Sequence, residues 1–252
     1  MKNIGSFVSR KISRAIFQYE MFRPGDRVLA AVSGGKDSMV LARDLHRKQK
    51  SFPVPFTLDC IHLKTEFTDP GEETRLNALF QEWGIPLISL DLQVEALLKP
   101  GKKMSCFWCA SLRRKTLLRY ALEQGYDVLA LGHHMDDILE SLLMNMVYNS
   151  ELSVMVPHLE YRDDLRLVRP LCLAAEDHVR EAAVSMGIPG RSCRCPHEGV
   201  SRRKQVRKAL DLLTDDSPAL KNNMYSSLSR LKLDFLPAGA LEKIQKNTKT
   251  GH

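Results

Sequence analysis

The chain has 252 residues, enough for one sizeable α/β domain with appendages or for two small domains, and its hydrophobic fraction of 44% and charged fraction of 27% are typical of a globular protein. No apolar run approaches the roughly 20 residues of a membrane span, and the N-terminal segment lacks the long apolar stretch of a secretory signal, so we expect a cytoplasmic protein with no membrane partner. The formal net charge of +7 is compatible with a polyanionic partner.

The first segment, 4–22, alternates apolar and basic positions at helical spacing, which predicts an amphipathic N-terminal helix within residues 1–22. Its apolar face would pack on the body of the protein, and Arg10, Lys11 and Arg14 would face outward. A basic face of this kind is usually just solvated, and contact with RNA is the alternative interpretation.

Short apolar runs typical of buried strands then alternate with segments that have apolar residues at helical spacing. The predicted strands cover 27–32, 56–62, 87–90, 126–131 and 166–171. The predicted helices cover 38–49, 72–83, 110–124, a segment that ends near 148, 175–186 and 200–213. This alternation predicts an α/β fold with a doubly wound parallel sheet, in which ligands bind at the carboxyl ends of the strands.

The turn after the first of these strands has the sequence Ser33-Gly34-Gly35-Lys36-Asp37-Ser38. Adjacent glycines permit a close approach of the backbone, and the free N–H groups that begin the next helix attract anions. Lys36 adds a cation, the serines add hydroxyl groups, and the spacing fits neither a Walker A loop nor a dinucleotide-binding fingerprint. We interpret the turn as a phosphate-binding loop. It resembles the PP-loop of the ATP pyrophosphatases, enzymes that split ATP into AMP and pyrophosphate while they adenylate a substrate.

The six cysteines fall into different contexts. Cys60 and Cys172 lie in apolar, strand-like segments and are expected in the core. Cys106 and Cys109 form a Cys-x-x-Cys pair that opens a helix, a position that favours thiolate. A metal site would need further ligands, and the chain offers them downstream at Cys193, Cys195 and His197. Zinc, an iron–sulfur cluster and a redox dithiol without metal are the three interpretations that this pattern allows.

A second polar cluster follows the predicted strand 126–131, in the order Gly132-His133-His134-Met135-Asp136-Asp137. Imidazoles and carboxylates together invite a metal-site interpretation, but tandem histidines on a regular element cannot easily face one ion. We favour a strand end at which one aspartate contacts Mg²⁺ bound to the ATP phosphates. Glu140, one turn further on, is expected to be a solvated helix residue.

Two basic segments, 113–119 and 202–208, flank the cysteine-containing stretches. Each is interpreted either as a solvated helix face or as a contact surface for the phosphate backbone of a nucleic acid. Trp108, inside the Cys-x-x-Cys pair, would either stack on a base drawn out of an RNA loop or pack around a bound cluster.

These motifs occur in one order along the chain. The order runs from the 33–38 loop through Cys106-x-x-Cys109 with Ser111-Leu112-Arg113-Arg114, the 132–137 cluster and Val168-Arg169-Pro170-Leu171 to a downstream cysteine near a basic helix. In this combination the chain resembles the TtcA family, the ATP-dependent tRNA 2-thiocytidine synthetases. The resemblance implies a PP-loop domain of the adenine nucleotide α-hydrolase-like fold over 23–213, followed by a C-terminal helical extension and tail over 214–252.

The resemblance also implies a reaction and its cofactors. ATP, with Mg²⁺, would adenylate the cytidine at position 32 of a tRNA anticodon loop, and a [4Fe-4S] cluster with one open iron would hold the sulfide that replaces the 2-oxo oxygen. Cys106 and Cys109 carry over as cluster ligands. Cys193 is the expected third ligand and Cys195 the alternative, because the family spacing Cys-x-x-Cys is replaced here by Cys193-Arg194-Cys195.

Further positions carry over from the family motifs. The residues expected to bind the nucleotide are Ser33, Gly34, Gly35, Lys36, Asp37, Ser38, Gly132 and His133. The residues expected to be catalytic are Lys36, Arg113, Asp136 and Asp137. The expected partners are tRNA, a cysteine desulfurase or other sulfur donor, and a second copy of the chain in a homodimer. The alternatives are a thiolase for a uridine or a small molecule, and an ATP-binding regulatory module without chemistry.

Overall fold

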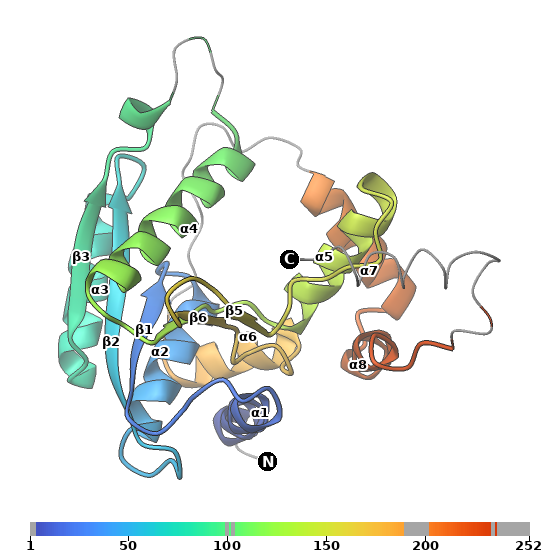
Figure 1. Ribbon diagram of the computed structural model, residues 1–252, viewed down its shortest axis with the longest axis horizontal. Helices are drawn as coiled ribbons and strands as arrows, with labels where there is room; N and C mark the ends of the chain where they lie inside the picture. Colours follow the sequence, from blue (N-terminus) through green and yellow to red (C-terminus); the bar gives the residue numbers. More distant parts are fainter. Residues whose placement is uncertain (1–3, 99–100, 102–103, 189–201, 233–234, 236–252) are drawn as a thin grey trace.

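The computed structural model describes residues 4–98, 101, 104–188, 202–232 and 235. Six strands form one sheet in the order β3-β2-β1-β4-β6-β5 (Figure 1). Their bounds are β1 Asp26–Val32, β2 Phe56–Thr65, β3 Leu87–Leu92, β4 Val128–Ala130, β5 His158–Glu160 and β6 Arg166–Val168. Neighbouring strands run parallel except β5, which pairs antiparallel with β6. The predicted α/β fold with a doubly wound parallel sheet is confirmed.

Strand lengths differ from the sequence prediction. β2 and β3 extend beyond their predicted ends because they pair with each other as far as Thr65 and Leu92. β4 and β6 are shorter than predicted, because residues 126–127 before β4, residue 131 after it and residues 169–171 after β6 form loops and turns. The edge strand β5 was not predicted, since three residues that are half-buried or exposed give no periodic signal.

The helices pack on both faces of the sheet. They are α1 Ile4–Gln18, α2 Lys36–Lys48, α3 Pro70–Trp83, α4 Cys106–Glu123, α5 Met135–Tyr148, α6 Glu176–Ser185, α7 Arg202–Thr214 and α8 Pro218–Ser227, with a short 3-10 helix at Glu95–Leu97. One hydrophobic core joins Val28, Ala30 and Val32 of β1 to α1, α2, α3 and α6. A second core joins Leu29 of β1 to α4. Successive side chains of a strand point to opposite faces, so this continuous apolar run is buried on both sides.

The amphipathic N-terminal helix is confirmed as α1, although it ends at Gln18 rather than near residue 22. Glu20 adopts a positive φ of 47°, which stops the helix and turns the chain toward β1. Val8, Ile12 and Ile16 are buried. The basic side of the helix faces outward as predicted, with Arg10 and Arg14 exposed and Lys11 half-buried.

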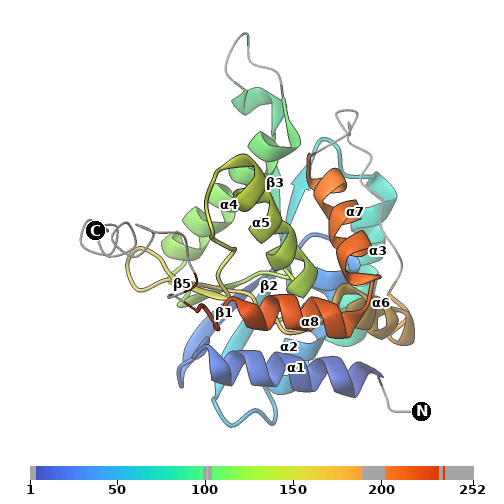
Figure 2. The same ribbon diagram turned by 90° about the vertical axis from the view of Figure 1, so that its right-hand side faces the viewer.

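The last two helices lie beside the sheet rather than on it. α7 and α8 both pack against α5 (Figure 2). Met135 and Leu139 of α5 form a small apolar cluster there with Leu210 of α7. Within the described ranges, no helix combines the length and the apolar character that crossing a membrane requires.

Candidate active site

The predicted phosphate-binding loop connects β1 to α2, and its serines hold it in shape. Ser38 Oγ accepts a hydrogen bond from the Ser33 backbone N–H at 3.1 Å and donates to the Gly35 carbonyl at 2.9 Å. Gly34 adopts φ of 83°, which a residue with a side chain rarely takes. The loop therefore places the first N–H groups of α2 at the carboxyl edge of the sheet, where a phosphate would bind.

Gly132 brings the end of β4 against this loop. A Cβ atom at this position would lie 2.9 Å from the backbone N and Cα of Ser38, a contact that real structures do not show. Only glycine lets the two backbones come this close. The glycine of the 132–137 cluster thus has a steric role that its sequence position alone could not reveal.

A cavity of about 340 Å³ opens at this edge of the sheet. Its wall brings together predicted site residues from three distant parts of the sequence, namely Ser33, Asp37, Ser38, Arg113, Gly132, His133 and Asp137. Arg114 of α4 and Arg203 of α7 complete the polar wall, and apolar side chains of β1, β2 and α4 supply the rest. A cavity with both apolar surface and converging polar groups is suited to a nucleotide.

Lys36 is held by two carboxylates beside the loop. Its Nζ lies 2.7 Å from Glu176 Oε1 and 3.2 Å from Asp37 Oδ1. Burial alone would lower the pKa of Lys36, but the hydrogen bond to Glu176 and the charge of Asp37 raise it above its ordinary value. The side chain is therefore a cation at neutral pH. Glu176 is the first residue of α6. It belongs to no recognisable motif, so the sequence alone does not predict its ion pair with Lys36.

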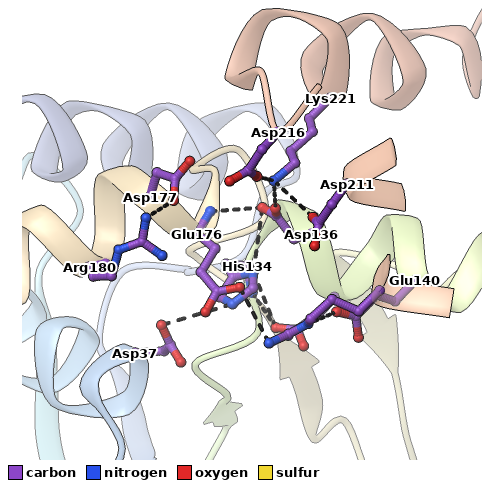
Figure 3. A network of polar contacts seen from close by, with 12 residues as sticks. Asp37, His134, Asp136, Glu140, Glu176, Asp177, Arg180, Asp211, Asp216 and Lys221 are labelled. Carbon is purple, nitrogen blue, oxygen red and sulfur yellow. Dashed lines mark hydrogen bonds and ion pairs between the residues drawn. The ribbon is translucent and has the colours of Figure 1, made fainter. Parts of the chain in front are cut away.

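The two neighbouring aspartates of the cluster face different surroundings, and Figure 3 shows those of Asp136. Asp136 is 2% exposed, and its Oδ1 lies 2.7 Å from Lys221 Nζ of α8 while its Oδ2 accepts from the Glu176 N–H at 2.7 Å. Asp137 instead lines the cavity, and its Oδ1 accepts from Arg203 at 2.5 Å. Asp137 is thus the one of the pair that a cavity ligand can reach, whereas Asp136 ties α5 to α6 and α8.

Glu140 corrects one sequence prediction. It was expected to be solvated, yet it is 1% exposed and accepts hydrogen bonds from Arg203 Nε at 2.5 Å and Arg207 Nε at 2.6 Å. Arg207 also lies 3.5 Å from Glu176. The prediction was wrong because the partner helix arrives from more than sixty residues downstream. Two cations of the 202–208 segment are consequently neutralised within the protein and do not form a free basic face.

The tandem histidines do not share a ligand. Burial lowers the pKa of His133 to about 4, and the charge of Arg169 adds to the effect, so its imidazole is neutral near pH 7. His134 is 2% exposed, and its backbone N–H donates to Asp137 at 3.0 Å, which caps α5. No group of His, Cys, Asp and Glu side chains within the described residues has the arrangement of a preformed metal site. His133 is therefore available as a neutral hydrogen-bonding group on the cavity wall.

The Cys-x-x-Cys pair occupies the first turn of α4. Ser105 caps this helix by accepting a hydrogen bond from the Trp108 N–H at 3.2 Å, so the helix begins at Cys106. Cys109 is half-buried and forms no disulfide. A cysteine pair in the first turn of a helix suits an iron site, because the helix dipole favours thiolate. Cys193, Cys195 and His197 lie outside the described residues.

The remaining cysteines behave as predicted. Cys60 and Cys172 are both fully buried in the main hydrophobic core. Burial raises the pKa of each thiol to about 12, so both stay protonated and unreactive. Trp108 is half-buried and packs on an apolar cluster with Leu63, Leu92 and Val94. Its indole is therefore engaged in apolar packing against the sheet, a role that differs from both roles expected from the sequence.

Replacing Glu140 by glutamine should lower the free energy of unfolding by about 1–3 kcal/mol, because an amide offers one acceptor oxygen to two arginines. The side chains of Arg203 and Arg207 are 49% and 44% exposed, so water can solvate them in the variant and the loss of stability stays below that of a fully buried ion pair. The control is Glu123→Gln, which removes an exposed ion pair with Arg119 and should cost less than about 1 kcal/mol. Urea unfolding of both variants measures the difference, and equal losses would contradict the anchoring role of Glu140.

Comparison with known proteins places this geometry in a family. The family model of the PP-loop domain matches residues 7–208. A tRNA-cytidine(32) 2-sulfurtransferase of Anaeromyxobacter sp. (strain Fw109-5) is 36% identical over 245 residues, with 95% of this chain and 80% of that protein covered. A protein of the same name from Syntrophotalea carbinolica is 31% identical, with 89% of each chain covered.

A solved structure shares the fold. The U34-tRNA thiolase NcsA from Methanococcus maripaludis, determined with its [4Fe-4S] cluster, superposes with a TM-score of 0.74 at 24% identity, covering 92% of this chain and 80% of that chain. The structural likeness covers 92% of this chain, and the sequence likeness to the Anaeromyxobacter protein covers 95% of it. This chain therefore belongs to the tRNA-cytidine(32) 2-sulfurtransferase family and is built on a PP-loop domain.

Proposed function

We propose that this protein uses ATP to replace the 2-oxo oxygen of cytidine 32 in tRNA by sulfur. Family membership supports the substrate and the reaction. The observation that carries the proposal is the cavity itself, which gathers the phosphate-binding loop, Asp137 and Arg113 beneath the helix that begins with the cysteine pair. A regulatory module would need the nucleotide-binding part of this arrangement but not the cysteine pair.

In the first step, the cytidine O2 attacks the α-phosphorus of ATP, forming a P–O bond as pyrophosphate leaves. The N–H groups of α2 and the Lys36 ammonium stabilise the charge that develops on the phosphate oxygens. Asp37 and Asp137 both lie on the cavity wall, and Asp137 is the carboxylate that we propose would hold Mg²⁺ on those phosphates. Asp136, committed to Lys221, acts by fixing the start of α5 beneath it.

In the second step, hydrosulfide attacks C2 of the adenylated base and AMP leaves with the original oxygen. Cys106 and Cys109 would hold a [4Fe-4S] cluster together with a third thiolate from Cys193. When bound, such a cluster supplies an iron with an open position that can carry the sulfide. The chain's own contribution is to hold the activated base still beside that position, because proximity replaces a bimolecular encounter. A cysteine desulfurase or another sulfur donor would supply the sulfide, and a homodimer is the proposed assembly.

The test is product analysis after anaerobic incubation of the reconstituted protein with ATP, sulfide and tRNA. We expect 2-thiocytidine at position 32 by mass spectrometry of digested tRNA, and AMP and pyrophosphate in equal amounts to it. ADP and phosphate as products would contradict the PP-loop chemistry. Thiolation of a uridine with unmodified cytidine 32 would overturn the substrate assignment and favour the uridine-thiolase alternative.

A further inference from the structure

The first turn of α4 presents two neighbouring aromatic side chains in opposite situations. Trp108 packs into the apolar cluster beside β2 and β3, whereas Phe107 is 85% exposed. From this contrast we infer that Phe107 is the residue on which the pyrimidine base of the substrate nucleotide stacks as it enters the site. The inference rests on the proposed function and adds a base-binding residue to it.

Helix geometry places Phe107 on the side of α4 that faces the cavity. α4 contributes Ala110, Arg113, Arg114 and Leu117 to the cavity wall. Phe107 precedes Ala110 by one turn and Arg114 by two, and residues spaced in this way share a face of an α-helix. Trp108 is rotated by about 100° from Phe107 and points to the sheet. The Phe107 ring therefore extends the cavity wall outward toward solvent, where an RNA loop would approach.

The chemistry of the reaction calls for such a group. C2 of a cytidine stacked within its loop is not accessible, so the base must be drawn out before O2 can reach the α-phosphorus. Proteins stabilise an extracted base by stacking it on an aromatic ring, and each such contact strengthens binding by roughly one to two orders of magnitude. Arg114, on the same face, is placed to contact a backbone phosphate while the base stacks.

Other surface aromatics lack this position. Phe235 is almost equally exposed, at 84%, but it lies in the C-terminal segment and not on an element that lines the cavity, as α4 does. Phe17 is half-exposed on α1 and packs with Phe52. Among the described aromatic residues, Phe107 combines a free ring with a place beside the cavity. Phe235 thus offers a matched control for the loss of an exposed phenyl group.

The experiment is a binding cycle between protein and RNA variants. An anticodon stem–loop RNA is prepared with cytidine or an abasic nucleotide at position 32, and its affinity for the full chain is measured with α,β-methylene ATP present. Phe107→Ala should weaken binding of the cytidine RNA by about 5- to 100-fold. The same variant should bind the abasic RNA with the affinity of the parent, because this RNA has no base at position 32 that could stack on either protein. Phe107→Trp should restore affinity for the cytidine RNA, and Phe235→Ala should leave it unchanged.

Three results would overturn the inference. Unchanged affinity of Phe107→Ala for the cytidine RNA would remove any role in binding. An equal loss for both RNAs, in a variant whose circular dichroism spectrum matches that of the parent, would show that Phe107 contacts something other than the base. Failure of Phe107→Trp to restore affinity would argue against a stacking surface. If the parent protein itself does not bind the stem–loop RNA, the proposed function fails instead, so the two failures are distinguishable.

Discussion

Replacing Lys36 by alanine should lower the rate of ATP-dependent turnover by about 10²- to 10³-fold, the usual loss when one preorganised group is removed from a developing charge. Lys36 is a cation at neutral pH because Glu176 and Asp37 raise its pKa. The two carboxylates form ion pairs with the Lys36 ammonium group, and the phosphates of bound ATP would take over part of their role. The rate of pyrophosphate release, measured at saturating ATP and tRNA, provides the readout.

The variant should still fold, because the ion pairs of Lys36 are partly exposed and lie beside the core rather than within it. Lys64→Ala is the matched control. Lys64 Nζ also lies 2.7 Å from a carboxylate, that of Glu73, but this ion pair joins β2 to α3 away from the cavity. Lys64→Ala should retain parental turnover. Parental turnover in Lys36→Ala would mean that the loop binds phosphate without assisting the reaction.

Substituting any of the three proposed cluster ligands should abolish both the brown chromophore and thiolation. Cys106→Ala, Cys109→Ala and Cys193→Ala each leave two thiolates, too few to retain a cluster. Cys195→Ala should keep both properties and serves as the control from the same segment. Anaerobic absorption spectra and iron and sulfide analysis, carried out before and after reconstitution, measure cluster content independently of activity.

Two outcomes discriminate between the remaining interpretations. Loss of the cluster in Cys195→Ala but not in Cys193→Ala would mean that Cys195 is the third ligand in place of Cys193. The proposed reaction would be unaffected. A parent protein that holds stoichiometric zinc and no iron, yet thiolates tRNA, would contradict the cluster. Zinc in a closed structural site takes four protein ligands and would recruit both Cys193 and Cys195.

Local chemistry was predictable from the sequence, and long-range pairing was not. The loop at 33–38, the two buried cysteines and the strand–helix alternation follow from short-range patterns, and the structure confirms them. The burial of Glu140 was not predicted, because the arginines that compensate its charge belong to α7 and not to the helix that carries Glu140. Glu176 and Lys221 were missed for the same reason. Each meets its partners only after α6, α7 and α8 have docked on α5 and the loop.

The attachment of α7 and α8 also divides the molecule into parts of unequal local stability. The sheet is complete without these helices, which are joined to α5 by Glu140, the Asp136–Lys221 ion pair and a small apolar cluster, and to the main core through Tyr225 of α8. A partial unfolding event can therefore release the two helices while the strand ladder stays intact. Because Arg203 forms part of the cavity wall, the same event enlarges the entrance. The attachment of α7 therefore bears on the size of the cavity entrance as well as on stability.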